Sequence, residues 1–150
     1  MISPDDKARR LVDQLQTVME GTEGAVARNA AVRDALSSQE IRVLRTVGRH
    51  EHCIMSAIAE RIRLSLSSVT GLIDRLVEKK LVCRDRSAED RRVVKVELTD
   101  EGRELHTAVV DSQVQFARGL LKTLSPAEQD DLLSLFGKIS DRIKSEKKSA

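Results

Sequence analysis

The stretch HEHC, at residues 50–53, brings together side chains that can bind a transition metal. Imidazole, carboxylate and thiolate groups are all ligands of zinc in proteins. Spacing this tight does not easily place all of them around one tetrahedral ion, and His106 is the one further imidazole in the chain. We therefore expect a solvated turn between two helices, with no metal and no other cofactor. The alternative is a metal- or redox-responsive site that uses His50, His52 and Cys53.

Other reactive groups give less support to covalent chemistry. There is no G-x-S-x-G motif, no Gly-rich phosphate loop and no histidine paired recognisably with a cysteine or serine, so we expect that the protein is not an enzyme. The two cysteines, Cys53 and Cys83, are too few for a disulfide framework and predict reduced thiols. We expect Cys83 to face the core as a small hydrophobe, with redox sensing as the alternative.

Charged residues gather at positions 84–95, where five basic side chains occur with three acidic ones. The formal net charge of the chain is only +2, so attraction to nucleic acid would have to come from clustered charge. The basic residues are Arg84, Arg86, Arg91, Arg92 and Lys95. Arginines at an exposed tip can enter the narrow, strongly negative minor groove of DNA. The alternative is a solvated hairpin whose charges only protect the edge of a sheet.

The segment RLSLSSVTGLIDRLVEKKLV predicts a helix just before this cluster. Ser65 is a good N-cap, and apolar residues follow it at helical spacing. The opposite face of the first two turns is small and polar, and consists of Ser67, Ser68, Thr70 and Gly71. Hydroxyl side chains there allow close approach and can bond phosphate oxygens and base edges. With a short helix at about residues 55–62 before it, the segment indicates a helix-turn-helix; an ordinary amphipathic helix is the alternative.

Two strand-like runs, Leu81–Arg86 and Val93–Leu98, flank the charged tip. In the second run, Val94, Val96 and Leu98 alternate with charged residues, which is the period of a half-buried antiparallel strand. The runs therefore predict a hairpin. A hairpin directly after a helix-turn-helix is a wing.

The composition is that of one helix-rich unit. The chain has 150 residues, of which 40% are hydrophobic and 33% are charged, and its only aromatic residues are two phenylalanines. No apolar run exceeds three residues, which predicts a cytoplasmic protein without a membrane span.

Several helix ends can be read directly. Ser37 and Glu40 form a capping box at the start of one helix, and we expect Gly48 to end it. The first helix begins at about Ser3 and is expected to stop near Gly21 and Gly24. Residues 25–36 are then expected to form a separate, alanine-rich helix. Further helices begin after Thr99 and after the capping box of Ser125 and Glu128.

These motifs together resemble the MarR-type winged helix-turn-helix transcriptional regulators. The matching stretches are SSQEIRVLRTV, SAIAERIRLSLSSVTGLIDRLVEKKLV and DRSAEDRRVVKVELTDEG. In the last of these, Asp90, Arg92, Leu98, Thr99 and Gly102 fall on the D-x-R...L-T-x-x-G pattern of the family's wing. The specific similarity covers about residues 37–105.

The resemblance implies a role for each matching residue. Arg92 would be the minor-groove arginine, Asp90 the carboxylate that holds it, and the helix from Ser65 to Lys80 the reading helix. Arg75 would contact the phosphate backbone. Lys80 stands where the family commonly has a glycine, so it is expected to adopt a left-handed or altered C-cap conformation.

The predicted fold is mainly α with a small β-hairpin wing: a winged helix-turn-helix at residues 37–98, flanked by dimerisation helices at 1–36 and 99–150. The flanking helices carry apolar stripes whose members are Leu11, Leu15, Val18, Phe116, Leu132, Phe136, Ile139 and Ile143. We expect a homodimer that binds double-stranded DNA at a pseudo-palindromic site; packing of the stripes within a monomer is the alternative. The resemblance implies a repressor and a small anionic or aromatic effector.

Overall fold

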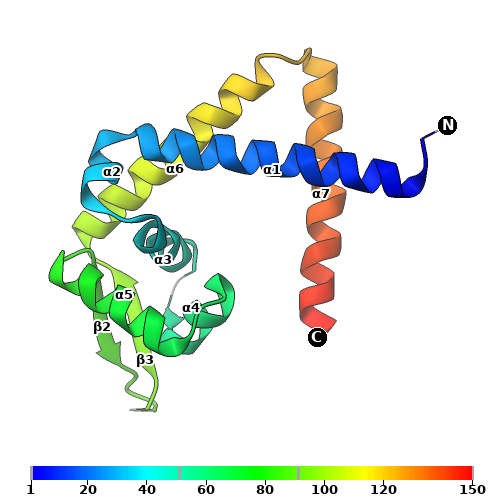
Figure 1. The fold of residues 1–150 in the computed structure, drawn as a ribbon. Helices are drawn as coiled ribbons and strands as arrows, with labels where there is room; N and C mark the ends of the chain where they lie inside the picture. Colours follow the sequence, from blue (N-terminus) through cyan, green and yellow to red (C-terminus); the bar gives the residue numbers. More distant parts are fainter. Residues whose placement is uncertain (1, 51, 91, 150) are drawn as a thin grey trace. The chain divides into compact units, whose positions relative to one another are not determined.

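The computed structural model describes residues 2–50, 52–90 and 92–149 (Figure 1). It is mainly helical with a small three-stranded antiparallel sheet, which confirms the predicted fold class. The chain forms two compact units, Met1–Gln113 and Val114–Ala150. In chain order the elements are α1 (Pro4–Arg28), α2 (Ala30–Ala35), α3 (Ser38–Arg49), β1 (Cys53–Ile54), α4 (Met55–Ile62), α5 (Leu66–Glu78), β2 (Val82–Arg86), β3 (Val94–Leu98), α6 (Asp100–Leu121) and α7 (Pro126–Ser149).

Helix α1 is longer than the sequence predicts. It begins after the N-cap Ser3 and continues through Gly21 and Gly24, so the prediction that it stops there is wrong. Each glycine costs only about 1 kcal/mol relative to alanine, and the surrounding residues favour a helix. The break comes instead at Asn29, whose side chain accepts a hydrogen bond from the amide of Ala31 and so caps α2.

Helix α3 has the predicted capping box, in which the Ser37 amide donates to Glu40 at 2.7 Å. Gly48 does not end this helix, contrary to the prediction, because α3 continues to Arg49. The glycine instead makes room for a neighbouring ring: a Cβ atom at position 48 would lie only 2.7 Å from Cγ of His106. The absence of a side chain therefore serves the packing of α6 against α3.

The sheet has the strand order β1-β3-β2, and both neighbouring pairs are antiparallel. Part of the predicted solvated turn is present, because His52 is exposed and lies in a turn, but Cys53 belongs to the short strand β1 and pairs with Val96. In the wing, Cys83 lies opposite Glu97 and is exposed, so the prediction that it faces the core is wrong. The core-facing residues of β2 and β3 are those that alternate with this pair, including Val82, Val96 and Leu98.

The helix-turn-helix and the wing share one aliphatic core. Its side chains with no exposed surface include Val43, Leu44, Ile58, Val69, Ile73, Leu76 and Val96. Helices α3, α4 and α5 enclose this core, and the β2-β3 hairpin projects beside them (Figure 1). Lys80, just after α5, has a φ of 60°, which confirms the predicted left-handed conformation.

The end of α5 is bonded directly to the start of α6. The Thr99 hydroxyl donates to the Lys80 carbonyl at 2.6 Å and accepts from the Gly102 amide at 3.0 Å. The Thr99 amide donates to the Leu81 carbonyl at 3.1 Å. The L-T-x-x-G pattern at Leu98 to Gly102 is therefore a structural joint between these two helices.

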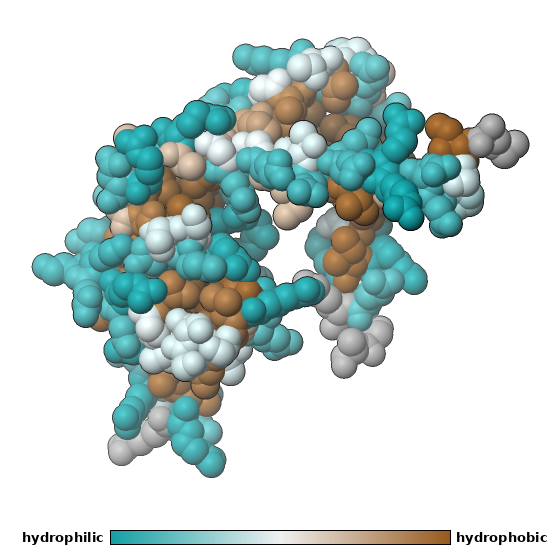
Figure 2. All heavy atoms as spheres, in the orientation of Figure 1, coloured by the Kyte–Doolittle hydropathy of each residue, from teal (hydrophilic) through white to brown (hydrophobic). Residues whose placement is uncertain are grey.

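The unit formed by Val114–Ala150 contains the end of α6 and the whole of α7. The predicted capping box is present, with the Ser125 amide donating to Glu128 at 2.8 Å. Helix α7 presents apolar side chains to the surface, shown in brown in Figure 2; they are Leu133, Leu135, Phe136, Ile139 and Ile143. Within the other unit, α1 likewise exposes Leu11, Val12, Leu15, Val18 and Met19. No described helix is both long enough and apolar enough to cross a membrane.

Candidate nucleic-acid interface

The start of α5 carries the predicted small polar face. Ser65 caps the helix, because its hydroxyl accepts a hydrogen bond from the Ser68 amide at 3.1 Å. Ser67 and Ser68 are exposed, and their hydroxyls lie 3.1 Å and 2.7 Å from the Ser65 hydroxyl. The hydroxyl of Thr70 donates to the backbone carbonyl four residues earlier. Each hydroxyl oxygen can still accept or donate a further bond, so this face can contact a polar partner.

Gly71 extends this face, and no described neighbour requires a glycine there. A Cβ atom there would have as its nearest neighbour the Nη1 atom of Arg75, at 3.9 Å, which is ordinary van der Waals contact. Glycine inside a helix costs about 1 kcal/mol relative to alanine. The described residues offer no steric gain in return.

The tip of the wing holds one arginine in an ordered arrangement. Asp90 Oδ1 accepts from the Arg92 amide at 2.9 Å and from its Nε at 3.3 Å. The side chain of Arg92 is nevertheless 93% exposed. Hydrophilic side chains cover the end of the wing, shown in teal in Figure 2. Arg91, the other predicted contact at this tip, lies outside the described residues.

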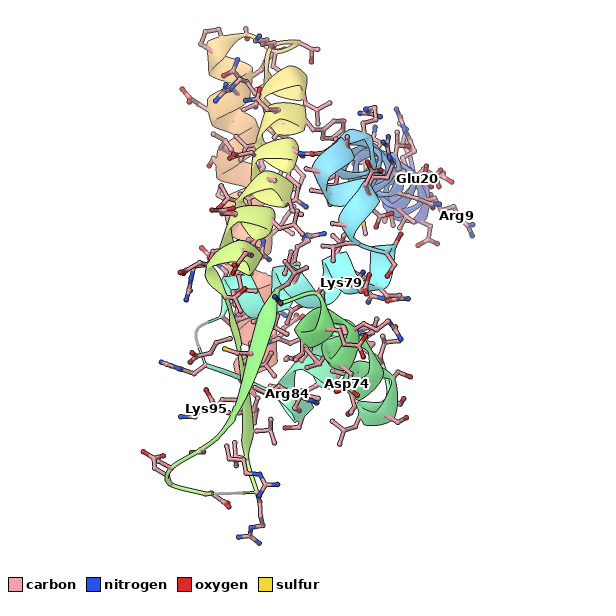
Figure 3. The ribbon with its side chains drawn as sticks, turned by 90° about the vertical axis from the view of Figure 1, so that its left-hand side faces the viewer. Arg9, Glu20, Asp74, Lys79, Arg84 and Lys95 are labelled. Carbon is pink, nitrogen blue, oxygen red and sulfur yellow. The ribbon has the colours of Figure 1, made fainter. Side chains whose placement is uncertain are left out.

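The remaining predicted contacts lie on β2 and α5. Arg86 is exposed at the end of β2. Arg84 instead makes an ion pair with Asp74 of α5, at 2.5 Å, and Figure 3 shows the two side chains together. Arg75 Nε lies 3.6 Å from the buried carboxylate of Glu40, while its side chain remains 55% exposed. The structure thus separates Arg84 from the exposed wing tip.

Glu40 is the centre of a buried charged cluster behind α5. Its side chain is only 3% exposed, and Lys79 Nζ donates to its two oxygens at 3.0 Å and 2.9 Å. Burial works to raise the pKa of this carboxyl, but hydrogen bonds from Ser37 and Lys79 outweigh burial and bring the pKa below its ordinary value. Lys79 also donates to the Ala35 carbonyl at 2.8 Å. The cluster fixes the end of α5 against the start of α3.

The candidate metal ligands do not converge. Across residues 2–50, 52–90 and 92–149, no three His, Cys, Asp or Glu side chains gather so that they could hold a metal ion. His52 Nδ1 lies 2.9 Å from Glu97, whereas Cys53 is buried beneath the sheet edge. Burial raises the pKa of the Cys53 thiol, and nearby Arg61 offsets this only in part, so its reactive thiolate form is disfavoured. These observations give no support to a metal site among the described residues or to a reactive Cys53.

Sequence reasoning missed two residues of this region, Asp74 and Lys79. A signal for the role of Asp74 was available. Arg84 is two residues after the apolar Val82 in the same strand, so its side chain lies on the same face and points to the helices. A lysine that enters a buried cluster from the end of a helix leaves no comparable pattern in the sequence.

A helix-turn-helix followed by an antiparallel wing, with an exposed polar helix face and an exposed wing arginine, defines a winged helix-turn-helix DNA-binding protein. The family model described as MarR family matches residues 36–94. The uncharacterized HTH-type transcriptional regulator YfiV of Bacillus subtilis (strain 168) is 32% identical over 113 residues, or 75% of this chain and 71% of YfiV. The chain belongs to the MarR family, whose members are transcriptional regulators and not enzymes.

A second relative and a solved structure are also similar to this chain. The HTH-type transcriptional repressor MdtR of Bacillus subtilis (strain 168) is 37% identical over 70 residues, or 47% of this chain and 45% of MdtR. The crystal structure of Streptococcus pneumoniae FabT in complex with DNA matches with a TM-score of 0.72 and 20% identity, over 92% of this chain and 98% of FabT. At that identity the match shows a shared fold.

Proposed function

We propose that this regulator is a homodimeric repressor that binds a pseudo-palindromic operator and responds to a small effector. The observation that carries the proposal is the pairing of an exposed small polar face on α5 with the exposed, Asp90-held side chain of Arg92. The helix face suits the major groove, and the arginine suits the adjacent minor groove. The relative MdtR is named as a repressor, which supports repression, and the solved complex of FabT with DNA supports DNA binding.

The exposed apolar faces of α1 and α7 support dimerisation. Six of the predicted dimer residues, Leu11, Leu15, Val18, Phe136, Ile139 and Ile143, are each between 39% and 51% exposed. Contiguous apolar surface of this kind marks a protein interaction site in a soluble protein. We propose that residues 1–36 and 99–150 form the dimer interface, and that residues 37–98 bind DNA.

A cleft of about 570 Å³ supports the effector part of the proposal. All three histidines of the chain line it, together with Arg103 and Thr107. Burial lowers the pKa of His106, and the charges of two neighbouring arginines lower it further. An anionic group would be favoured beside Arg103 and the two arginines near His106.

Selection of bound duplexes from a random library tests the central claim. We expect a two-fold symmetric site whose half-sites are about one DNA turn apart, roughly 34–36 Å. Sedimentation of the free protein should give the mass of a dimer. Failure to enrich any duplex, or a monomer bound to a single half-site, would contradict the proposal.

Replacing Arg92 with alanine should weaken binding to the selected duplex by about 1–3 kcal/mol, because the wing loses its minor-groove contact. The dimer should remain intact, since the Arg92 side chain is almost fully exposed. Fluorescence anisotropy over a range of salt concentrations measures the effect. Arg33→Ala is the matched control, because that exposed side chain pairs only with the adjacent Asp34 among the described ion pairs. Equal affinity of Arg92→Ala and wild type would remove the wing from the DNA interface.

Replacing Gly71 with alanine should stabilise the fold but weaken DNA binding. The free energy of unfolding should rise by about 0.5–1 kcal/mol, because alanine is the better helix former and the position has room. Duplex binding should weaken by about 1 kcal/mol, because the new methyl group overpacks a close contact. Urea titration and anisotropy measure the two effects, with Gly24→Ala in α1 as control. Unimpaired DNA binding would show that α5 does not approach DNA through this face.

A further inference from the structure

The register of the wing fixes where Arg84 points. In the β2-β3 pair Arg84 lies directly opposite Val96, and directly opposed side chains share one face of a sheet. Val96 is fully buried, so this is the face that packs on the helices. The other face carries Asp85 opposite Lys95, and Lys95 points away from the helices in Figure 3. The Arg84 side chain therefore points towards α5 and not towards the outer surface.

Asp74 of α5 is the partner of this guanidinium. Arg84 Nη1 donates to Asp74 Oδ1 at 2.5 Å, with the side chains 37% and 47% exposed. Asp74 lies on α5 between the buried residues Ile73 and Leu76, so its backbone position is set by the core. The pair is thus a direct charged bond between the helix and the strand of the wing.

A cleft between α5 and the wing lies beside this bond. Its lining includes Thr70 of the polar helix face, Arg84, and Arg92 of the wing tip. Two arginines that line one cleft repel each other, and Asp74 supplies the compensating negative charge to the inner one. The outer arginine, Arg92, is held by Asp90 and extends from the tip.

We propose that Asp74 and Arg84 are positioning residues that set the wing relative to α5, and that Arg84 is not itself a phosphate contact. The inference rests on the proposed roles of α5 and the wing in reading DNA. It assigns Asp74, an acidic residue beside the DNA-reading face, a favourable effect on DNA binding. The pair would act by holding Arg92 at the distance from Thr70 that simultaneous contact with both grooves requires.

The sign of one substitution separates this role from simple charge effects. An acidic side chain near DNA repels phosphates, so Asp74→Asn would strengthen binding if Asp74 acted only through its charge. If Asp74 positions the wing, the same change should weaken binding by about threefold to tenfold. Arg84→Met should weaken binding to the same extent without altering the salt dependence. Loss of a phosphate contact would instead lower the slope of log K against log salt by about one.

The charge-reversed pair, Asp74→Arg with Arg84→Asp, preserves the net charge and the possibility of the bond. We expect it to recover most of the affinity that either single change loses. The penalty of Arg92→Ala should also shrink in the Asp74→Asn background, because a displaced wing no longer uses that arginine. Urea titration should show nearly unchanged stability, as expected for a partly exposed ion pair.

Two results would overturn the inference: stronger binding by Asp74→Asn, or a reduced salt slope in Arg84→Met. A DNA-free measurement keeps it separate from the proposed function. Amide hydrogen exchange in β2 and β3 should be faster in Asp74→Asn than in wild type, whereas exchange in α5 should not change. If Arg92→Ala binds as well as wild type, the proposed role of the wing fails. In that case the amide hydrogen exchange of β2 and β3 in Asp74→Asn alone tests the inference. Exchange unchanged from wild type would reject it.

Discussion

Replacing Gly102 with alanine is expected to lower the free energy of unfolding by about 3 kcal/mol. A Cβ atom at this position would collide with the carbonyl oxygen of Leu81 and lie 2.9 Å from its carbonyl carbon. Both obstacles are backbone atoms, so no side-chain rotation can relieve them. Movement of this carbonyl would also strain the hydrogen bond that it accepts from the Thr99 amide.

Urea unfolding at one fixed protein concentration measures this loss, because the apparent stability of a dimer depends on concentration. Gly71→Ala is the matched control in the same compact unit, since a methyl group there meets only ordinary contact. The two alanine variants should move the unfolding midpoint in opposite directions. A Gly102→Ala protein as stable as wild type would show that α6 does not approach Leu81 this closely.

Replacing Lys79 with methionine should cost about 2–3 kcal/mol at neutral pH. Loss of one partner from a fully buried ion pair typically costs about 3–5 kcal/mol, because the other charge is left uncompensated. The value is lower here because the Lys79 side chain is 39% exposed, and the Ser37 amide and Arg75 still face Glu40. The Ala35 carbonyl also loses a donor.

The contribution of Glu40 to the pH dependence of stability should change sign when Lys79 is removed. In wild type the pKa of Glu40 lies below its unfolded value. Its contribution is therefore present above the unfolded pKa of about 4.3 and is lost as the pH falls through the folded pKa. Without Lys79, burial should raise the folded pKa above the unfolded one. The Lys79→Met deficit should then be small below the unfolded pKa and should grow as the pH rises through the folded pKa.

Urea titrations from mildly acidic to neutral pH test both parts of this expectation. Lys122→Met removes an exposed lysine near the end of α6 and serves as the control. The double variant Glu40→Gln with Lys79→Met should recover much of the lost stability, because no buried charge remains and glutamine can still close the capping box. A pH-independent deficit would mean that Lys79 acts through packing and not through the charge of Glu40.

The sequence predicted the elements of the DNA-binding region well, because each carried a local signal. Ser37 with Glu40, Ser65 and Thr99 occupy the predicted caps, and the wing strands differ from their predicted starts by one residue. The left-handed Lys80 was also predictable, since it stands where the family commonly has glycine. Apart from Lys80, whose conformation the family resemblance predicted, these features depend on neighbours within a few residues.

Features that depend on distant residues were not predictable in the same way. Gly48 looked like a helix end, but its role is to admit His106, which lies on another helix. The first helix continued through two glycines because propensity alone does not decide where a long helix stops. Cys83 was assigned to the wrong face. It is adjacent to the core-facing Val82, so the alternation along a strand should have placed it on the outer face. The DNA-contact and dimer residues stay predictions until the experiments above are done.

Among the described residues, the strand order β1-β3-β2 leaves both outer strands of this small sheet without a neighbour on one side. Such edges can recruit strands from other molecules and seed aggregates. One edge, β1, is only two residues long and leads at once into α4. The other, β2, carries Arg84, Asp85 and Arg86 in succession. The charges of this strand therefore also protect the protein's solubility, and variants that neutralise several of them together would be prone to precipitate at high concentration.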